Sequence, residues 1–369
     1  MGLQKWRSKK MILKIILILL LIVIFLGIIL FISKMYQLKK LEKMTSSDVI
    51  DYITKDDDEI KISIAIIKDG EVTYQVYGKN GKILDNTRND YEIGSISKTF
   101  VGLMLSKAIE DNKINLNSSI SEYLALDKDK YYPTIERLIT HTSGYKSHYF
   151  NKQMASNYFH QNNDFYGIHK NDILNKIKNI KLEDKDYKFN YSNFGIAVIG
   201  LVLEQVYNED FVTLMNDFIE DDLNLKNTKV ALSTGDLSGY WNWKEDDGYI
   251  PAGAIISDIE DMAQYLKYYM NYEDNYISNT YDELKSINAN NFIYEKMNIR
   301  MDKVGMTWLI DEKNNIIWHN GGTSNFNSYI AFDKKKKIGV VVLGNTSPIK
   351  KVPMTVIGAD LMNELKSTL

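Results

Sequence analysis

Serine and lysine residues spaced three apart are the first candidates for chemistry in this chain. The Ser-x-x-Lys spacing occurs at Ser95/Lys98, Ser143/Lys146 and Ser347/Lys350. At the start of a helix, this spacing places a hydroxyl in the first turn and an amine one turn later on the same face. Among the three serines, only Ser95 follows a glycine and opens a strongly apolar segment. We therefore predict that Ser95 is a nucleophile at a helix N-terminus, and that burial lowers the pKa of Lys98 enough for it to accept a proton.

A tyrosine and an asparagine two residues apart form the second candidate. Tyr-x-Asn occurs at Tyr149, Tyr191, Tyr240 and Tyr269. The pair Tyr191 and Asn193 is distinguished by the apolar helical segment 194–206 that follows it. A phenol can act as a base where neighbouring cations lower its pKa, and an amide can hold a substrate carbonyl. We assign these two roles to Tyr191 and Asn193.

The third candidate is His319 with the glycines that follow it, Gly321 and Gly322. This is the only His-x-Gly in the chain, and it comes at the end of a short apolar strand-like run, 316–318. Glycine at a strand end allows the backbone to approach another segment closely. A backbone N–H at this point can pair with the N–H of Ser95 to form an oxyanion hole.

The sequence shows no pattern of cysteines or histidines that would indicate metal or thiol chemistry. The chain has no cysteine, which excludes thiolate clusters and cysteine nucleophiles. None of the histidines forms a His-Glu-x-x-His motif or an i,i+4 pair; they are His141, His148, His160, His169 and His319. We therefore predict neither a metal site nor a cofactor.

Strand-like segments lie at both ends of the body and helical segments lie between them. Alternating runs at 60–67 and 72–77 flank Asp69-Gly70, which is a hairpin signal. Short β-rich runs return at 306–310, 316–319, 329–332 and 338–343. This order predicts an α+β fold, an α/β sandwich in which both chain ends form one antiparallel sheet covered by helices. A helical second lobe is expected at about 113–290.

The charge distribution separates a basic head from an acidic body. Residues 1–43 carry nine Lys or Arg against one Glu, a net +8, so the total of -3 leaves -11 for the rest. Residues 15–32 form a nearly unbroken apolar run, long enough to cross a bilayer and longer than the core of a cleavable signal peptide. We predict a basic cytoplasmic N-terminus at 1–10, a single-pass signal anchor at 11–33, a polar stalk at 34–58 and an extracellular catalytic domain at 59–369. The acidic body is a poor candidate for nucleic-acid binding.

Together and in this order, the three motifs resemble the active-site motifs of the serine penicillin-recognising enzymes. The resemblance is to the class C β-lactamase-like family, which includes D-alanyl-D-alanine carboxypeptidases and related esterases. Two further stretches agree with it: Leu-Ile-Thr-His-Thr-Ser-Gly at 138–144, and Pro-Ala-Gly at 251–253 leading to Ser-Asp-Ile-Glu-Asp-Met-Ala at 257–263. The similarity covers about residues 59 to 366.

The resemblance implies a role for each matching residue. Ser95 would be acylated, and Lys98 and Tyr191 would share its proton and later activate the hydrolytic water. The substrate would be bound by Asn193, His319, Gly321 and Gly322. His319 stands where many relatives carry the lysine of a Lys-Thr-Gly triplet, and the chain has no such triplet. A mostly neutral side chain there suits esters or peptides better than substrates that depend on a carboxylate contact.

The expected function is that of a membrane-anchored extracytoplasmic serine hydrolase. It would act through an acyl-enzyme on amide or ester bonds of cell-envelope D-amino acid derivatives, including peptidoglycan- or teichoic-acid-derived material, or of β-lactam-like compounds. The alternative is a catalytically weak or inactive relative of the penicillin-binding proteins that binds an envelope ligand as a sensor or immunity protein. Labelling of the serine by an acylating probe discriminates between the two.

Overall fold

The structure is a computed structural model. It describes residues 44–85, 88–160, 163–232, 235–271, 276–290, 292–348 and 352–368, with a few scattered positions between 14 and 29. The chain divides into two units, Met1–Thr45 and Ser46–Leu369. The predicted N-terminus at 1–10 and most of the predicted anchor at 11–33 lie outside the described residues. Within the described part, none of the helices has both the length and the apolar character needed to span a membrane.

The second unit begins earlier in the chain than predicted. Helix α2 (Ser46–Thr54) falls inside the segment 34–58 that was expected to be stalk. Its apolar side chains Val49, Ile50 and Ile53 are at most 3% exposed. They recur at i, i+1 and i+4, which gives one buried helix face. The Ser46 hydroxyl also donates a 2.7 Å hydrogen bond to Asp360 near the other end of the chain. The folded unit therefore includes these residues.

An eight-stranded sheet formed from both ends of this unit confirms the predicted architecture. Its strand order is β2-β1-β11-β10-β9-β8-β7-β6. The bounds are β1 (Ile62–Lys68), β2 (Glu71–Tyr77), β6 (Lys285–Ser286), β7 (Lys303–Val304), β8 (Leu309–Asp311), β9 (Ile316–Gly322), β10 (Asn327–Asp333) and β11 (Ile338–Gly344). Strand β1 pairs antiparallel with β11 from Ile62 opposite Gly344 to Lys68 opposite Ile338. The β1–β2 hairpin turns through Asp69 and Gly70, both at positive φ, as the sequence predicted.

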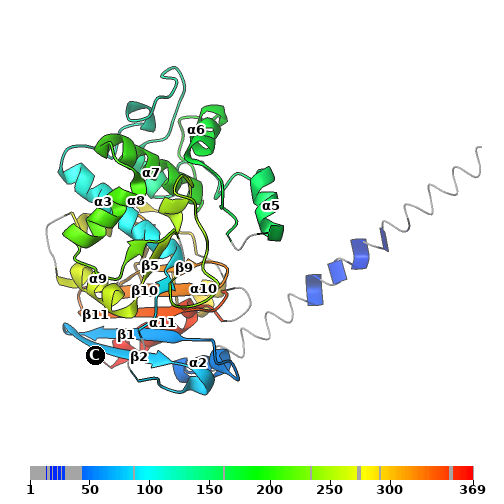
Figure 1. Ribbon diagram of the computed structural model, residues 1–369, viewed down its shortest axis with the longest axis vertical. Coiled ribbons are helices and arrows are strands. Elements are labelled where there is room, and N and C mark those ends of the chain that lie inside the picture. The colour runs from blue at the N-terminus through cyan, green and yellow to red at the C-terminus, as the bar shows by residue number, and fades with distance from the viewer. Residues whose placement is uncertain are drawn as a thin grey trace, which may run out of the picture. The chain divides into compact units, whose positions relative to one another are not determined.

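Helices cover both faces of the sheet (Figure 1). Alternate residues of a strand face opposite sides. In β11, Gly339 faces Leu266 of α9 (Ile259–Asn271), whereas Gly344 faces Met354 of α11 (Met354–Ser367). All seven residues of β10 and of β11 are buried as a result. Because α9 packs on the sheet, the separate helical part of the molecule ends before the predicted residue 290.

The remaining helices and a second sheet fill the middle of the chain. The helices are α3 (Ser97–Glu110), α4 (Ile135–Ile139), α5 (Lys152–His160), α6 (Lys170–Asn179), α7 (Asn193–Tyr207), α8 (Phe211–Asp217) and α10 (Phe292–Lys296). Short 3₁₀ helices are η1 (Lys79–Gly81), η2 (Gly94–Ile96), η3 (Ile120–Glu122), η5 (Ile250–Ala252) and η6 (Ser278–Thr280), and η4 (Phe218–Asp222) is a short π-helix. A small sheet of order β3-β5-β4 joins β3 (Tyr91–Glu92), β5 (Ile255–Ser257) and β4 (Lys229–Val230). The sequence did not predict this sheet.

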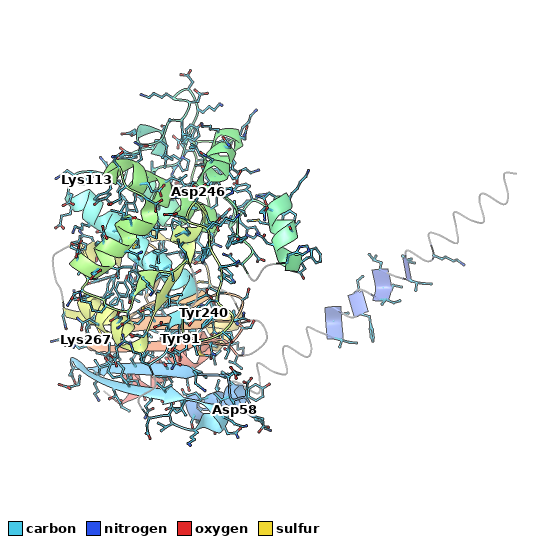
Figure 2. All side chains as sticks on the ribbon, in the orientation of Figure 1. Asp58, Tyr91, Lys113, Tyr240, Asp246 and Lys267 are labelled. Carbon is cyan, nitrogen blue, oxygen red and sulfur yellow. The ribbon has the colours of Figure 1, made fainter. Side chains whose placement is uncertain are left out.

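The small sheet holds the segment that leads into the apolar helix α3. Tyr91 and Glu92 of β3 pair with Ser257 and Ile256 of β5, and the chain then turns through η2 into α3. Figure 2 labels Tyr91 and Tyr240 close to one another. The Tyr240 hydroxyl donates a 2.5 Å hydrogen bond to the carbonyl of Asp90. The pairing with β5 and the hydrogen bond from Tyr240 therefore both hold the backbone of residues 90–92, which precede Ser95.

Candidate active site

Ser95 lies in the 3₁₀ turn η2, where the chain passes close to the end of β9. Gly94 before it has φ +51°, and a Cβ at that position would lie 2.5 Å from the backbone N of Gly322. Both the left-handed conformation and the close approach require glycine here. This contact brings Ser95 and Gly322 to one place, although they come from opposite ends of the domain.

Lys98 is fully buried beneath Ser95. Its Nζ donates hydrogen bonds of 2.8 Å to Ser95 Oγ and 2.6 Å to the carbonyl oxygen of Ala252. The side chain is 0% exposed. Burial lowers the pKa of Lys98 to about 7, because an ammonium loses its hydration there. A neutral amine within hydrogen-bond distance of a serine hydroxyl can act as its general base.

Tyr191 lies directly before α7 and contacts the same serine. Its hydroxyl is hydrogen-bonded to Ser95, and its ring centroid is 5.1 Å from Lys98 Nζ. Burial raises the pKa of Tyr191 above its usual value, so the phenol is neutral near pH 7. The condition set for Tyr191 to be a free base, a pKa lowered by cations, is not met. As a neutral phenol hydrogen-bonded to Ser95, Tyr191 can exchange a proton with that hydroxyl.

The predicted substrate-binding residues separate into two groups. Asn193 and Gly322 line a pocket beside Ser95, whereas His319 and Gly321 are not among its lining residues. Gly321 is needed for packing, since a Cβ there would lie 1.9 Å from the carbonyl oxygen of Ile93. Ser95 and Gly322, whose N–H groups were predicted to form the oxyanion hole, do share the pocket.

His319 is a buried and neutral side chain on β9. It is 1% exposed, and its Nδ1–H donates a 2.7 Å hydrogen bond to the carbonyl of Asn320. Burial and the neighbouring charge of Lys98 lower the pKa of His319 to about 3. Its ring lies 6.3 Å from that of Tyr191. His319 therefore provides no positive charge for a substrate carboxylate near neutral pH.

His141 packs against the ring of Tyr191, a role that the sequence did not predict. Its Nδ1 accepts a 3.1 Å hydrogen bond from the N–H of Ser192, and its ring lies 4.6 Å from the ring of Tyr191. His141 is 1% exposed and has φ +58°, which is uncommon for a residue other than glycine. The sequence feature that could have pointed to His141 is its place in the Thr-His-Thr-Ser-Gly stretch at 140–144. The strained backbone and the ring contact identify it as a positioning residue.

Glu92, three residues before Ser95, is a second buried group that the sequence did not reveal. One carboxylate oxygen accepts from the backbone N–H of Trp241 at 2.5 Å, and the other accepts from the Thr323 hydroxyl at 2.6 Å. The side chain is 4% exposed, and burial raises the pKa of Glu92 to about 7. Glu92 thus connects β3, the strand that leads to Ser95, with the loop that follows β9 and with the segment around Trp241.

Aromatic side chains form much of the pocket wall. The pocket contains about 280 Å³ of empty space, part of it open to solvent. It is lined by Ser95, Phe165, Asn193, Trp241, Trp243, Tyr249, Ala252, Gly253 and Gly322. The four aromatic residues come from the loop between α5 and α6 and from the long segment between β4 and η5. No motif or spacing marks them in the sequence.

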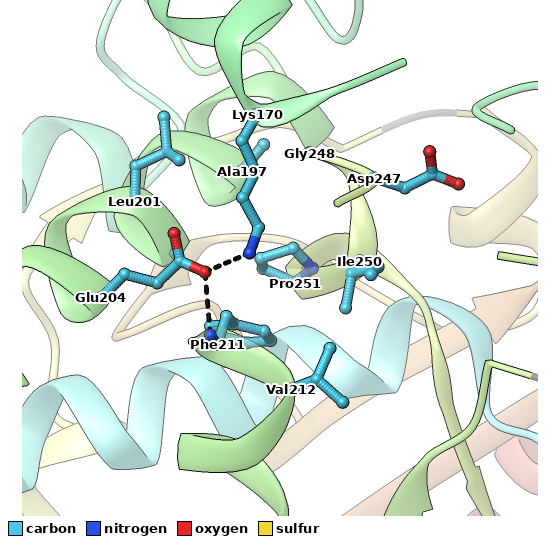
Figure 3. A pocket seen from close by; sticks show the side chains of 11 residues that line it. Lys170, Ala197, Leu201, Glu204, Phe211, Val212, Asp247, Gly248, Ile250 and Pro251 are labelled. Atoms are coloured by element: carbon cyan, nitrogen blue, oxygen red, sulfur yellow. Dashed lines mark hydrogen bonds and ion pairs between the residues drawn. The ribbon is translucent and has the colours of Figure 1, made fainter. Parts of the chain in front are cut away.

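A second cavity, between α6, α7 and α8, is lined by a network of ion pairs (Figure 3). Lys170 Nζ lies 2.5 Å from both Glu204 and Asp210. Glu204 also accepts a 2.8 Å hydrogen bond from the N–H of Phe211 at the start of α8. These charges are mutually satisfied and join three helices, which is a structural role. No group of three or more potential metal ligands occurs among the residues that the structure describes.

Comparison with known proteins gives one family model and several curated relatives that match most or about half of the chain. A family model described as Beta-lactamase matches residues 49–355. Protein flp of Staphylococcus aureus strain MW2 is 26% identical over 313 residues, which cover 77% of this chain and 59% of that protein. A beta-lactamase of Providencia stuartii is 28% identical over 198 residues, covering 52% of this chain and 47% of that protein. The chain thus spans less than two thirds of the length of these curated relatives.

Solved structures share the fold at low sequence identity. The octameric penicillin-binding protein homologue from Pyrococcus abyssi has a TM-score of 0.67 and 20% identity, covering 83% of this chain and 73% of that one. A beta-lactamase/D-alanine carboxypeptidase from Yersinia pestis, complexed with citrate, has a TM-score of 0.65 and 19% identity, covering 85% and 94%. At this identity the likeness concerns the fold alone.

Proposed function

The chain belongs to the beta-lactamase family, and from this premise we propose that it is a serine hydrolase that acts through an acyl-enzyme on Ser95. The observation that carries the proposal is the 2.8 Å hydrogen bond between Ser95 Oγ and a fully buried lysine whose pKa is lowered to about 7. An activated nucleophile needs a group that can accept its proton and that lies within hydrogen-bond distance, and Lys98 meets both conditions.

The proposed reaction has two halves. In the first, Ser95 Oγ attacks the substrate carbonyl carbon while its proton passes to Lys98, directly or through the Tyr191 hydroxyl. The N–H groups of Ser95 and Gly322 stabilise the oxyanion. Collapse of this intermediate breaks the bond to the leaving group, which takes the proton back from the Tyr191–Lys98 pair. In the second half, water attacks the acyl-enzyme ester and gives a proton to the same pair. The second intermediate then collapses: the bond from the carbonyl carbon to Ser95 Oγ breaks, Oγ takes that proton back from the pair, and the acid is released.

The neutral His319 bears on the choice of substrate. Substrates whose binding depends on a carboxylate would need a cation, and His319 does not supply one near neutral pH. We therefore propose, as the principal substrates, amide or ester bonds of cell-envelope D-amino acid derivatives whose binding does not depend on a carboxylate contact, with β-lactam-like compounds as slower substrates. The family membership and the intact Ser95–Lys98–Tyr191 arrangement favour an enzyme over a ligand-binding protein.

The test is a turnover screen on the purified protein with three substrates: a short acyl ester, a D-Ala-D-Ala peptide and a chromogenic cephalosporin. We expect the ester or the peptide to be hydrolysed with the higher kcat/KM. Mass spectrometry of the quenched reaction should place the acyl adduct on the peptide that contains Ser95. Binding of the compounds without adduct or turnover would favour the sensor or immunity-protein alternative.

We also propose that residues 11–33 anchor the protein in a membrane with the catalytic domain outside. Support comes from the apolar run at 15–32 and its flanking basic residues. The full-length chain, expressed in cells, should sediment with membranes and resist extraction by carbonate. Protease added to intact cells should degrade the domain. Recovery in the soluble fraction, or protection of the domain until the cells are lysed, would contradict this proposal.

A further inference from the structure

Glu92 is a buried carboxylate near the nucleophile that the proposed reaction does not use. It lies three residues before Ser95 and is 4% exposed. In the described part of the chain, its charge is influenced by burial and by two hydrogen bonds, with no neighbouring cation. We propose that Glu92 is a positioning residue for the oxyanion hole. Through Thr323 it holds the backbone N–H of Gly322 in line with that of Ser95. The inference rests on the proposed function, because the oxyanion hole matters only if Ser95 is acylated.

The two oxygens of this carboxylate hold two different segments. Oε2 accepts a 2.6 Å hydrogen bond from the Thr323 hydroxyl, and Oε1 accepts one of 2.5 Å from the backbone N–H of Trp241. Hydrogen bonds to a charged acceptor are stronger than those between neutral groups. A buried carboxylate without such donors is costly, so the loss of either donor leaves an acceptor unsatisfied. Burial raises the pKa of Glu92 to about 7, so the carboxylate prevails above that pH.

The Thr323 contact acts directly on the oxyanion hole. Thr323 follows Gly322 in the chain, and a Cβ on Gly94 would lie 2.5 Å from the backbone N of Gly322. The two segments are therefore in contact, and a small shift of one relative to the other changes the spacing between the N–H groups of Gly322 and Ser95. An oxyanion hole depends on donors placed about 2.7–3.1 Å from the oxyanion. The bond from Thr323 to Glu92 fixes this spacing from the loop that follows β9.

Trp241 closes a set of hydrogen bonds around Glu92. Its backbone N–H donates to Glu92, and its Nε1–H donates a 3.0 Å hydrogen bond to the hydroxyl of Ser324, the residue after Thr323. Strand β3, the segment around Trp241 and the loop after β9 are thus each bonded to the other two. Each of the three restricts the motion of the others, and loss of the carboxylate removes two of the three connections at once. This double connection gives a reason for a buried charge at Glu92.

Glu92→Gln tests the positioning role with little change in side-chain volume. The amide has one oxygen, so it can accept from Thr323 or from Trp241 but not from both, and its NH₂ group faces the other donor. At about pH 8, where the wild-type carboxylate is ionised, kcat for the best substrate should fall about 10- to 100-fold. The loss is smaller than that of a whole oxyanion donor, because Ile93 still accepts a 2.8 Å hydrogen bond from Ser328 on β10. KM should change by no more than about threefold, since the oxyanion forms only as the reaction proceeds.

Binding of a boronic acid supplies a measurement that a purely structural role would not change. A boronic acid adds to a serine hydroxyl and places a boron-bound oxygen where the oxyanion forms, so its affinity reports on the transition state. We suggest methylboronic acid, which is too small to depend on the pocket wall. Its Kd, measured per active site counted with a fluorophosphonate, should rise by a factor similar to the fall in kcat. Glu204→Gln is the matched control, because Glu204 also accepts a backbone N–H, that of Phe211 at 2.8 Å, but lines a different cavity. It should leave both values unchanged.

Thr323 gives an independent route to the same answer. Thr323→Val removes one of the two hydrogen bonds and should lower kcat, whereas Thr323→Ser keeps the hydroxyl and should stay within about threefold of the wild type. Equal kcat in the two Thr323 variants would overturn the positioning role, even where Glu92→Gln fails to fold. A Glu92→Gln protein with unchanged kcat per active site, or with a change in KM alone, would also overturn it while leaving a Ser95 hydrolase in place. Absence of any Ser95-dependent hydrolysis in the wild type would overturn the proposed function and this inference together.

Discussion

Ser95→Ala is expected to lower kcat/KM for the best substrate by roughly 10³- to 10⁶-fold, which is the range seen when a hydrolase loses its nucleophile. The physical reason is that, in the described part of the chain, Ser95 Oγ is the one serine or threonine hydroxyl hydrogen-bonded to the Lys98 amine, at 2.8 Å. The variant should also fail to form an adduct with an activated fluorophosphonate. Steady-state kinetics and intact-protein mass spectrometry measure the two effects.

Ser143→Ala provides a matched control from a second Ser-x-x-Lys. Ser143 is buried, and its Oγ accepts a 3.3 Å hydrogen bond from the N–H of Tyr145, so its loss removes a hydroxyl without touching Lys98. This variant should label and turn over like the wild type. Equal labelling of Ser95→Ala and wild type would show that the nucleophile has been assigned to the wrong residue.

Lys98 should produce a rising limb in the pH profile of kcat/KM, with a midpoint near pH 7. Only the neutral amine can accept the Ser95 proton, so activity should fall about tenfold for each pH unit below the midpoint. The midpoint follows from the burial that lowers the pKa of Lys98 to about 7. Lys98→Met should remove this limb and reduce kcat/KM by roughly 10²- to 10⁴-fold. A stopped-flow or plate assay from pH 5 to pH 9 measures the profile.

The lowered pKa of Lys98 also predicts how the free energy of unfolding changes with pH. This measurement shows whether Lys98→Met has lost activity because the base is gone or because the protein is misfolded. Between pH 7 and about 10.4 the unfolded chain keeps the lysine proton that the folded protein has released, so the free energy of unfolding should rise with pH in this window. Lys98→Met should lose that rise and be no less stable than the wild type at pH 7. Lys107→Met, on the same helix and only partly buried, should keep both the rise and the pH profile. An unchanged pH profile in Lys98→Met would contradict its assignment as base.

Sequence patterns were sufficient for the parts of the site that depend on short-range spacing. Ser95 and Lys98 are one helical turn apart, so their contact follows from the helix that the apolar residues after them predict. The β1–β2 hairpin follows in the same way from Asp69-Gly70 between two alternating runs. The pairing of β1 with β11 could be predicted because strands at the two chain ends have few other partners.

The remaining features depend on contacts between distant segments. The hydrogen bonds of Glu92 with Trp241 and Thr323 join strand β3 to two loops, and no periodicity in these segments predicts the contact. The aromatic pocket wall is hidden in the same way among 25 tyrosines, 13 phenylalanines and 5 tryptophans. Helix α2 was missed because its polar residues dominate the composition of 34–58, while its three buried side chains form only a short stripe.

The pairing of the first strand with the last has a consequence for how the protein matures. Strand β1 is synthesised early but lies between β2 and β11, so its second edge stays open until almost the whole chain is available. The Gly94–Gly322 contact that sets the oxyanion site is likewise made across the full domain. The centre therefore cannot form until the chain has been made at least through β9, and a product truncated before that strand would lack the site.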